Sequence, residues 1–465
     1  VRGATSGFYT DYNFRKRLKE GSETEDGWKL GDIVHSTPLL IGTPAYFYPW
    51  SSYISFKETY KNRTKVLYFG ANDGMLHAIN TESGDELWGY IPPDQLGKLK
   101  YLLDPEYCHI YYVDAPPKAI DAEISGSWKT VLVVEEREGG ESISCLDVTD
   151  PGYDNVSVMW YFEDSDLGKT FSYPALGRIT TASEESLWIA IFGSGPNEGK
   201  PGYLYMLNLA DGSIIKKLNL NLYNKDWYYL FWSGSDISKG TYTFSSNEYE
   251  NKISPVYAFD TSYYQDYNLD RIYVGDSKGN IWRFSIDEFL DQEEVNPSSN
   301  LLFKVGGYEA CGKYYPVITQ NPADLDSNYH QMDLDYLNPD VNLEISASPA
   351  VAYLGYSSNL ENLISGEYEW RKKLIKPDTI DLPTSPPISS ICFPFSNKSY
   401  PLYGVYVGTG EYGEYGTDYP FQVFLGLFDS YDFWRHVKDG YNRDFYYDIR
   451  PTNFRVLKDT PNYRI

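Results

Sequence analysis

The stretch that decides the fold is residues 65–92, KVLYFGANDGMLHAINTESGDELWGYIP. The run 66–70 is rich in β-branched and aromatic residues, which predicts a buried strand. Asn72-Asp73-Gly74 predicts a hairpin turn, because these residue types tolerate positive φ. Residues 75–80 form the return strand, and a second turn leads to a third strand that carries Trp88. We expect an antiparallel meander the size of one propeller blade, which needs copies of itself to bury both faces.

Four further stretches repeat this plan of strand, glycine turn and strand. The clearest is RIYVGDSKGNIWRFS at 271–285, where Asp276 opens the turn. Each stretch follows a segment with a proline near its start, and successive prolines lie 57 to 94 residues apart. A compact blade takes roughly 40–50 residues, so long inserted loops are expected. The other copies lie at 128–148, 187–212 and 404–429, and the prolines are Pro38, Pro117, Pro174, Pro255 and Pro349.

The repeats predict an all-β chain that folds as an irregular β-propeller of antiparallel, four-stranded-type blades with long inter-blade insertions. A lead-in segment at 1–30 is expected to precede one propeller domain at 31–465. A short helix is expected within 93–113, an irregular insertion at 213–250, and long loops at 288–345 and 356–400. The blade units start near residues 36, 115, 172, 254 and 347.

Composition excludes several classes of protein. Aromatic residues make up 17% of the chain, which excludes a disordered protein. The 46 tyrosines fit pleated, half-buried strands, and a tyrosine-rich binding surface is the alternative. A net charge of −25 argues against nucleic acid or anionic lipid as a partner, because both need a basic face. No apolar run of about 18 residues predicts a transmembrane segment. The start at Val1 indicates a mature chain or one cut from a longer protein.

No sequence motif indicates an enzyme active site. The five histidines lack paired metal-ligand spacing, and His35 and His77 are expected to be hydrogen-bonded core residues. The chain holds no GxSxG, HExxH or P-loop motif. The glycine turns with a trailing tryptophan also resemble quinoprotein dehydrogenases, but those enzymes need adjacent cysteines, which this chain lacks. We therefore expect a structural or interaction protein with no catalytic or cofactor-binding residues.

Six motifs in order resemble the C-terminal β-propeller of the PilY-type family, the type IV pilus tip-associated adhesin and assembly proteins. Each motif alone is weak, but their succession is specific, and the resemblance runs from about residue 2 to about residue 430. No closing segment of the family's propeller is recognisable in 431–465, so we expect it to be absent or diverged. The motifs are LGDIVHSTPLLIGTP at 30–44, GANDGMLHA at 70–78, YYVDAP at 111–116, WKTVL at 128–132, LDVTDP at 146–151 and DLG at 166–168.

The resemblance implies an exported, extracellular or outer-membrane, pilus-associated protein. It would dock on minor pilins and support pilus extension, adhesion or twitching motility. The alternative is an adhesin that binds glycan or a host protein through its tyrosine-rich insertions, and a quinoprotein-like dehydrogenase is a remote third reading. The insertions are expected to make the contact, because the blades leave little freedom for recognition. The negative net charge predicts a basic pilin surface as the complement.

The resemblance also implies a calcium loop of the type DxDxDGxxD just before Arg271. Counting back, Ser262 and Tyr264 stand at the first two acid positions, and Tyr267 stands at the glycine position. A tyrosine is not expected to adopt the backbone of that turn. The favoured expectation is a loop without metal, and the alternative is a weak, rearranged calcium site. Its carboxylate ligands would be Asp260, Asp266 and Asp270.

The four cysteines permit two disulfides with three possible pairings. Cys145 lies within a predicted strand and is expected to be a buried thiol. Cys311 and Cys392 lie in loop-like stretches beside the insertions. Since the resembled family is exported, where disulfides persist, these two are the expected bridge.

Overall fold

The structure is a computed structural model, and it describes a defined part of the chain. The protein consists of two compact units. Unit 1 is residues 1–219, 258–270 and 289–291, and unit 2 is the remainder. The described residues are 15, 30–197, 199–220, 226–233, 236–243, 251–261, 266–295, 300–304, 307–310, 313–316, 345, 347–356, 401–408, 421–430, 434–438, 444–448 and 454–461.

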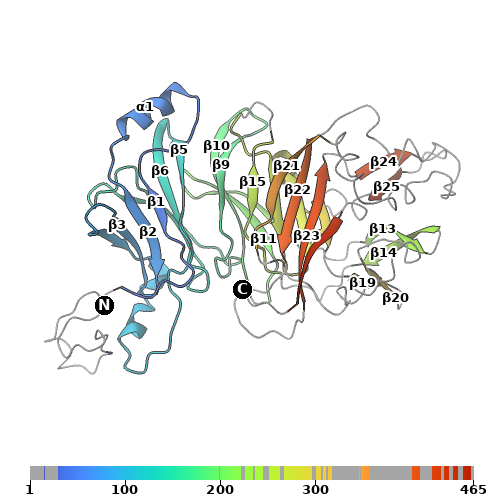
Figure 1. The fold of residues 1–465 in the computed structure, drawn as a ribbon, viewed down its shortest axis with the longest axis horizontal. Helices are drawn as coiled ribbons and strands as arrows, with labels where there is room; N and C mark the ends of the chain where they lie inside the picture. Colours follow the sequence, from blue (N-terminus) through green and yellow to red (C-terminus); the bar gives the residue numbers. More distant parts are fainter. Residues whose placement is uncertain are drawn as a thin grey trace. The chain divides into compact units, whose positions relative to one another are not determined.

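Three four-stranded antiparallel sheets make up most of unit 1 (Figure 1). In each, the strands pair in chain order, as expected for meanders. The first is β1 (Leu39–Ile41), β2 (Val66–Ala71), β3 (Met75–Asn80) and β4 (Glu86–Tyr90); the second is β5 (Lys118–Ile124), β6 (Ser127–Val134), β7 (Ile143–Asp147) and β8 (Ser157–Phe162); the third is β9 (Ala175–Thr180), β10 (Ser186–Gly193), β11 (Tyr203–Asn208) and β12 (Ile214–Asn219).

The described residues of the later part of the chain add two more four-stranded sheets and three hairpins. The fourth sheet has the order β15-β16-β17-β18 and the fifth β21-β22-β23-β26. The strands are β13 (Asp226–Ser233), β14 (Asp236–Thr243), β15 (Tyr257–Phe259), β16 (Arg271–Gly275), β17 (Asn280–Ser285), β18 (Leu301–Lys304), β19 (Gly307–Ala310), β20 (Lys313–Pro316), β21 (Ala350–Tyr356), β22 (Pro401–Gly408), β23 (Phe421–Ser430), β24 (Trp434–Lys438), β25 (Asp444–Asp448) and β26 (Phe454–Pro461).

Helices are few among the described residues. They are α1 (Ser51–Thr59), α2 (Ile286–Asp291) and the 3₁₀ helices η2 (Pro93–Gln95) and η3 (Leu99–Leu103). The last two confirm the short helix expected within 93–113. The sheet-dominated architecture confirms the predicted fold class.

The stretch 213–250 differs from the irregular insertion that we expected. It supplies β12, the fourth strand of the third sheet, and the β13–β14 hairpin. The physical reason lies in the sequence DWYYLFWS at 226–233, whose aromatic residues favour the extended backbone. Residues 357–400, which hold most of the last expected insertion, lie outside the described part of the chain.

The prolines that mark the repeats each come just before the first strand of a four-stranded sheet. In three repeats a serine one or two residues before this proline is bonded to the second strand of the sheet. Its hydroxyl accepts a hydrogen bond from the backbone N–H of a glycine at the end of the second strand. The pairs are Ser36 with Gly70 at 2.7 Å, Ser172 with Gly193 at 2.5 Å and Ser254 with Gly275 at 2.9 Å. The serine before the proline therefore makes the same hydrogen bond, to a glycine of the second strand, in each of these three sheets.

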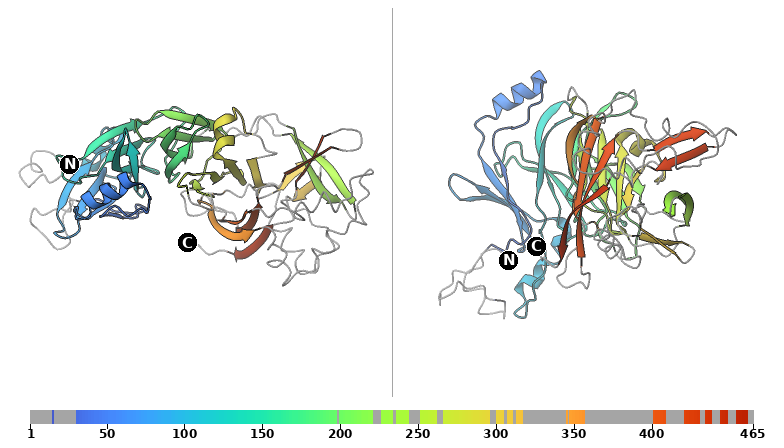
Figure 2. Two further views of the ribbon diagram at one scale, coloured as in Figure 1. Left: turned by 90° about the horizontal axis from the view of Figure 1, so that it is seen from above. Right: turned by 45° about the vertical axis from the view of Figure 1, so that its right-hand side comes forward.

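Buried side chains of adjacent sheets form the core of unit 1. Trp88 of β4 donates its indole N–H to the Pro151 carbonyl at 2.9 Å, and Trp160 of β8 does the same to Leu209 at 2.9 Å. Each tryptophan thus joins one sheet to the turn of the next. Figure 2 shows α1 at one end of these sheets, and α1 contacts β6.

Candidate functional site

The three predicted carboxylates lie in one loop, residues 260–270, that closes on itself. Asp260 Oδ2 accepts from the Tyr267 amide at 2.9 Å, and Asp266 Oδ1 accepts from the Asn268 amide at 2.9 Å. Asp270 Oδ2 accepts from the amide and the hydroxyl of Thr261 at 2.7 and 2.8 Å. The loop is therefore held by its own carboxylates.

The carboxylates influence one another electrostatically. Burial raises the pKa of Asp270, and the negative charges of Asp260 and Asp266 raise it further, against the hydrogen bonds from Thr261. A cation would relieve this repulsion, and carboxylate oxygens are donors that Ca²⁺ prefers. Ser262 and Tyr264, which stand at the first two acid positions, lie outside the described residues, so calcium binding at this loop stays a prediction. Among the described residues, no group of three or more His, Cys, Asp or Glu side chains is placed to hold a metal ion.

Tyr267 corrects one expectation about this loop. Its backbone is left-handed, with φ of +64°, although a tyrosine was not expected to adopt the glycine conformation. Such a conformation costs on the order of 1–3 kcal/mol. The Asp260 carboxylate fixes the Tyr267 amide, and the ring packs edge-on against Tyr48 and Trp50 at 5.6 and 5.7 Å. These contacts offset the strain, so loss of the glycine does not by itself remove the turn.

Calcium titration is expected to show no binding tighter than the micromolar range, because few charged ligands are available and they are already hydrogen-bonded. If calcium binds, Asp266 and Asp270 should hold it together with backbone oxygens. Isothermal titration calorimetry of the wild type and of Asp270→Asn tests this expectation. A tight, stoichiometric site in the wild type that Asp270→Asn abolishes would contradict it.

An aromatic cluster packs against Tyr267 of the loop 260–270, and we did not predict it from the sequence. It joins the β1–β2 connection to β6 and β10, and Trp128 lies at its centre, 4.7 Å from Tyr53 and 5.6 Å from Trp188. The dense aromatic run YFYPWSSYISF at 46–56 was the available signal. Its members are Tyr46, Tyr48, Trp50, Tyr53, Phe56, Tyr60, Trp128, Trp188 and Tyr267.

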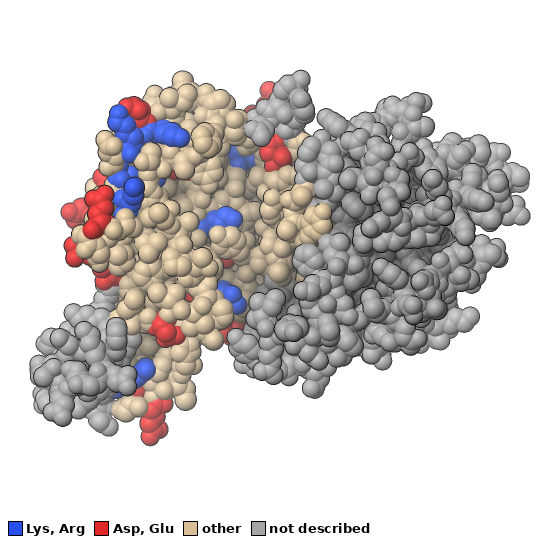
Figure 3. Space-filling view, viewed as in Figure 1, with Lys and Arg blue, Asp and Glu red and all other residues tan. Residues whose placement is uncertain are grey.

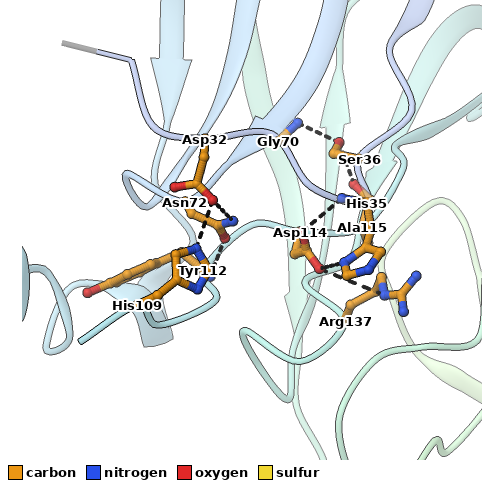
Figure 4. Close-up of polar contacts among 10 residues, drawn as sticks. All are labelled: Asp32, His35, Ser36, Gly70, Asn72, His109, Tyr112, Asp114, Ala115 and Arg137. Atoms are coloured by element: carbon orange, nitrogen blue, oxygen red, sulfur yellow. Dashed lines mark hydrogen bonds and ion pairs between the residues drawn. The ribbon is translucent and has the colours of Figure 1, made fainter. Parts of the chain in front are cut away.

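His35 belongs to a polar network that includes Asp114 and Arg137 (Figure 4). Its ring Nδ1 lies 2.6 Å from Asp114 Oδ2, and its backbone amide donates to Asp114 Oδ1 at 3.1 Å. The Nε of Arg137 lies 3.9 Å from the same carboxylate. The expected hydrogen bonding is confirmed, but the His35 side chain is 39% exposed and is not a core residue. The buried Asp114 is thereby surrounded by cationic or donating groups.

A second network in Figure 4 fixes the long connection after β4. Asn72 donates to Asp32 at 3.0 Å and accepts from the Tyr112 amide at 3.0 Å. His109 Nε2 lies 2.7 Å from Asp32 Oδ2, the same oxygen that accepts from Asn72. The hydrogen bonds to Asn72 and His109 hold the pKa of Asp32 below its usual value, against partial burial. The two networks anchor loops, and their polar groups serve as hydrogen-bond partners for one another.

His77 confirms the expectation of a buried, hydrogen-bonded core histidine. Its two ring nitrogens lie 3.1 Å from Asp73 and 2.8 Å from Glu86, and its side chain is 4% exposed. Burial lowers the pKa of His77, but the two carboxylates prevail and raise it overall. The carboxylates of Asp73 and Glu86 therefore favour the protonated form of His77 within the first sheet.

Raising the pH is expected to destabilise unit 1 through His77. Since its folded-state pKa is raised, its stabilisation is complete below the unfolded value of about 6.5 and is lost as pH rises through the folded pKa. When His77 loses its proton, the melting temperature should fall by about 2–4 °C for each kcal/mol lost from the free energy of unfolding. The melting temperature should decline between about pH 6 and pH 8 in the wild type, and this decline should be smaller in His77→Gln. Equal slopes would contradict this expectation.

Of the cysteines, Cys145 is confirmed as a buried thiol in β7, and Cys108 is an exposed free thiol. Cys311 and Cys392 lie outside the described residues, so their pairing stays a prediction. Within the described part of the chain, none of the helices is both long and apolar enough to cross a membrane.

The sequence of this chain is similar to sequences of PilY1 proteins. Residues 30–223 match the family described as the PilY1 beta-propeller domain. The type IV pilus biogenesis factor PilY1 of Pseudomonas aeruginosa (strain UCBPP-PA14) is 34% identical over 307 residues, covering 62% of this chain and 24% of the relative. A PilY1 homolog of Xylella fastidiosa (strain Temecula1) is 34% identical over 275 residues, covering 55% of this chain and 17% of the relative.

The fold has a solved counterpart. The crystal structure of the Pseudomonas aeruginosa PilY1 C-terminal domain matches with a TM-score of 0.52 and 22% identity, over 84% of this chain and 64% of that one. At this identity the match concerns the fold, and it agrees with the sheets described above. The aligned part spans about a quarter or less of the length of the two curated relatives.

Proposed function

Residues 30–223 belong to the PilY1 β-propeller family, and from this premise we propose that the chain acts in type IV pilus biogenesis. The observation that carries the proposal is the 34% identity with a PilY1 protein across 62% of the chain. The role is that of an interaction protein. We place it outside the cell, at the pilus or the outer membrane.

The chain would act by docking on minor pilins. The blades support this role as a scaffold: Trp88, Trp160 and the serine–glycine pairs fix the sheets, which leaves recognition to the connections. The net charge of −25 favours a basic pilin surface as the main complement, so association should weaken as salt rises. Adhesion to a host surface or a glycan would be a further role of the same exposed connections.

Gene deletion tests the proposal. Loss of the full-length protein that contains this chain should abolish surface pili and twitching motility, and a plasmid copy should restore both. Electron microscopy of sheared pili and a subsurface motility assay measure the outcome. A deletion strain with a normal number of pili and normal motility would overturn the proposal.

A further inference from the structure

The connection between β1 and β2 carries the most exposed large apolar side chain among the described residues. Phe47 is 84% exposed, and Ile54 on α1 is 57% exposed. Lys57 lies one turn after Ile54, and its Nζ sits 4.9 Å from the centre of the Phe47 ring. Lys61 follows at the end of the helix and pairs with Glu58. We call Phe47, Ile54, Lys57 and Lys61 the α1 patch.

The buried side of the same segment is rigidly anchored. The Tyr53 hydroxyl donates to Asp121 at 2.7 Å and accepts from the Tyr46 amide at 3.0 Å. The Trp128 indole donates to Ser52 Oγ at 3.0 Å. The segment that carries the α1 patch is therefore anchored to the second sheet before any partner binds. Preorganisation of this kind reduces the entropy lost on binding.

The charge of this segment is opposite to that of the protein. Residues 44–65 hold four cations and one anion, within a chain of net charge −25. Arg63 is turned inward, where it donates to Thr130 and Thr149, while Lys57, Lys61 and Lys65 remain at the surface. Figure 3 shows lysine and arginine side chains gathered over α1. An exposed aromatic ring within a local basic field is complementary to an acidic surface with an apolar pocket.

We propose that the α1 patch docks on an acidic face of a minor pilin, with Phe47 in an apolar pocket and Lys57 and Lys61 facing carboxylates. The proposal rests on the pilus function argued above. It adds a second contact, in which a basic patch of this chain meets an acidic pilin surface, to the contact between the acidic chain and a basic pilin surface. A protein fits better than an anionic bilayer. The three surface lysines attract an anionic bilayer only weakly against the repulsion of a strongly acidic chain, whereas a protein can also offer the Phe47 ring an apolar pocket.

Complementation of the deletion strain tests this contact. Two variants are introduced into the full-length protein: Phe47→Ala, and the double substitution Lys57→Glu with Lys61→Glu. Both alter exposed or half-exposed side chains, and circular dichroism and melting should match the wild type. We expect at least about a tenfold loss of pili for the double variant, since two attractive charge contacts become repulsive. We also expect a loss of pili for Phe47→Ala, which removes the apolar anchor. Lysine substitutions on the acidic face of the partner pilin should restore the pili.

The chain offers a matched control on η3. Lys100 lies 5.1 Å from the ring of Tyr101, which is 45% exposed, so the pair repeats the lysine-over-aromatic geometry at another place. Lys100→Glu with Tyr101→Ala should leave piliation unchanged. Wild-type piliation in both patch variants would overturn the α1 contact, whereas pili in the uncomplemented deletion strain would overturn the pilus function itself. Lysine-dependent binding to phosphatidylglycerol vesicles without any loss of pili would overturn the choice of a protein partner.

Discussion

Replacing Gly70 with alanine is expected to destabilise unit 1 by about 3 kcal/mol. A Cβ at this position would lie 2.1 Å from the Val113 carbonyl oxygen, a backbone atom that cannot rotate away. The strand cannot retreat either, because the Gly70 amide is bonded to Ser36 Oγ, which in turn donates to the Ala115 carbonyl at 2.8 Å. The denaturant midpoint and melting temperature of the purified chain measure the effect.

Gly97 provides the control for this substitution. A Cβ added there meets nothing within 4 Å, so Gly97→Ala should change the free energy of unfolding by no more than about 0.5 kcal/mol. Equal effects at Gly70 and Gly97 would contradict the close approach between the first sheet and the connection that follows it.

Replacing Asp276 with alanine is expected to cost about 3–5 kcal/mol in unit 2, because several buried N–H donors would lose their acceptor at about 1–3 kcal/mol each. Asp276 is fully buried and receives five hydrogen bonds. Among the donors are the indole N–H of the buried Trp282 at 2.8 Å and the side-chain amide of Asn251 at 3.1 Å. Alanine would leave these donors without an acceptor in the core.

Asp211 is the matched control, since it makes the same kind of turn at the surface. Its Oδ1 accepts from the amide and the hydroxyl of Ser213 at 2.9 and 2.6 Å. Because water can replace these bonds, Asp211→Ala should cost about 1 kcal/mol or less. Asp276→Ala melting within the range of Asp211→Ala would show that the buried network does not stabilise the fourth sheet.

Much of the fold was predictable because its determinants are local. The turn residues Asn72 to Gly74 and Asp276 to Gly279, and the prolines that precede the sheets, act within a few residues of their own position. What the sequence could not supply depends on contacts across long separations. Tyr267 keeps a left-handed backbone because Tyr48 and Trp50, more than 200 residues earlier, pack against its ring.

The same limit applies to the candidate sites. The resemblance to the PilY-type family singled out Asp260, Asp266 and Asp270, but their hydrogen bonds to the loop's own donors follow from its closed conformation. The exposure of Phe47 could not be read from its neighbours, because the run that contains it is mostly buried aromatic residues. Strand β26 was missed because 454–461 lacks the glycine turn that marks the other repeats.

Direct binding of the purified chain to the globular domains of the minor pilins tests the central claim most directly. Biolayer interferometry should give saturable binding to at least one pilin domain, weakened by rising salt. The Lys57→Glu, Lys61→Glu variant should bind about tenfold more weakly, and the Lys100→Glu, Tyr101→Ala control should bind like the wild type. The absence of saturable binding to every minor pilin at concentrations up to about 100 µM would contradict the account.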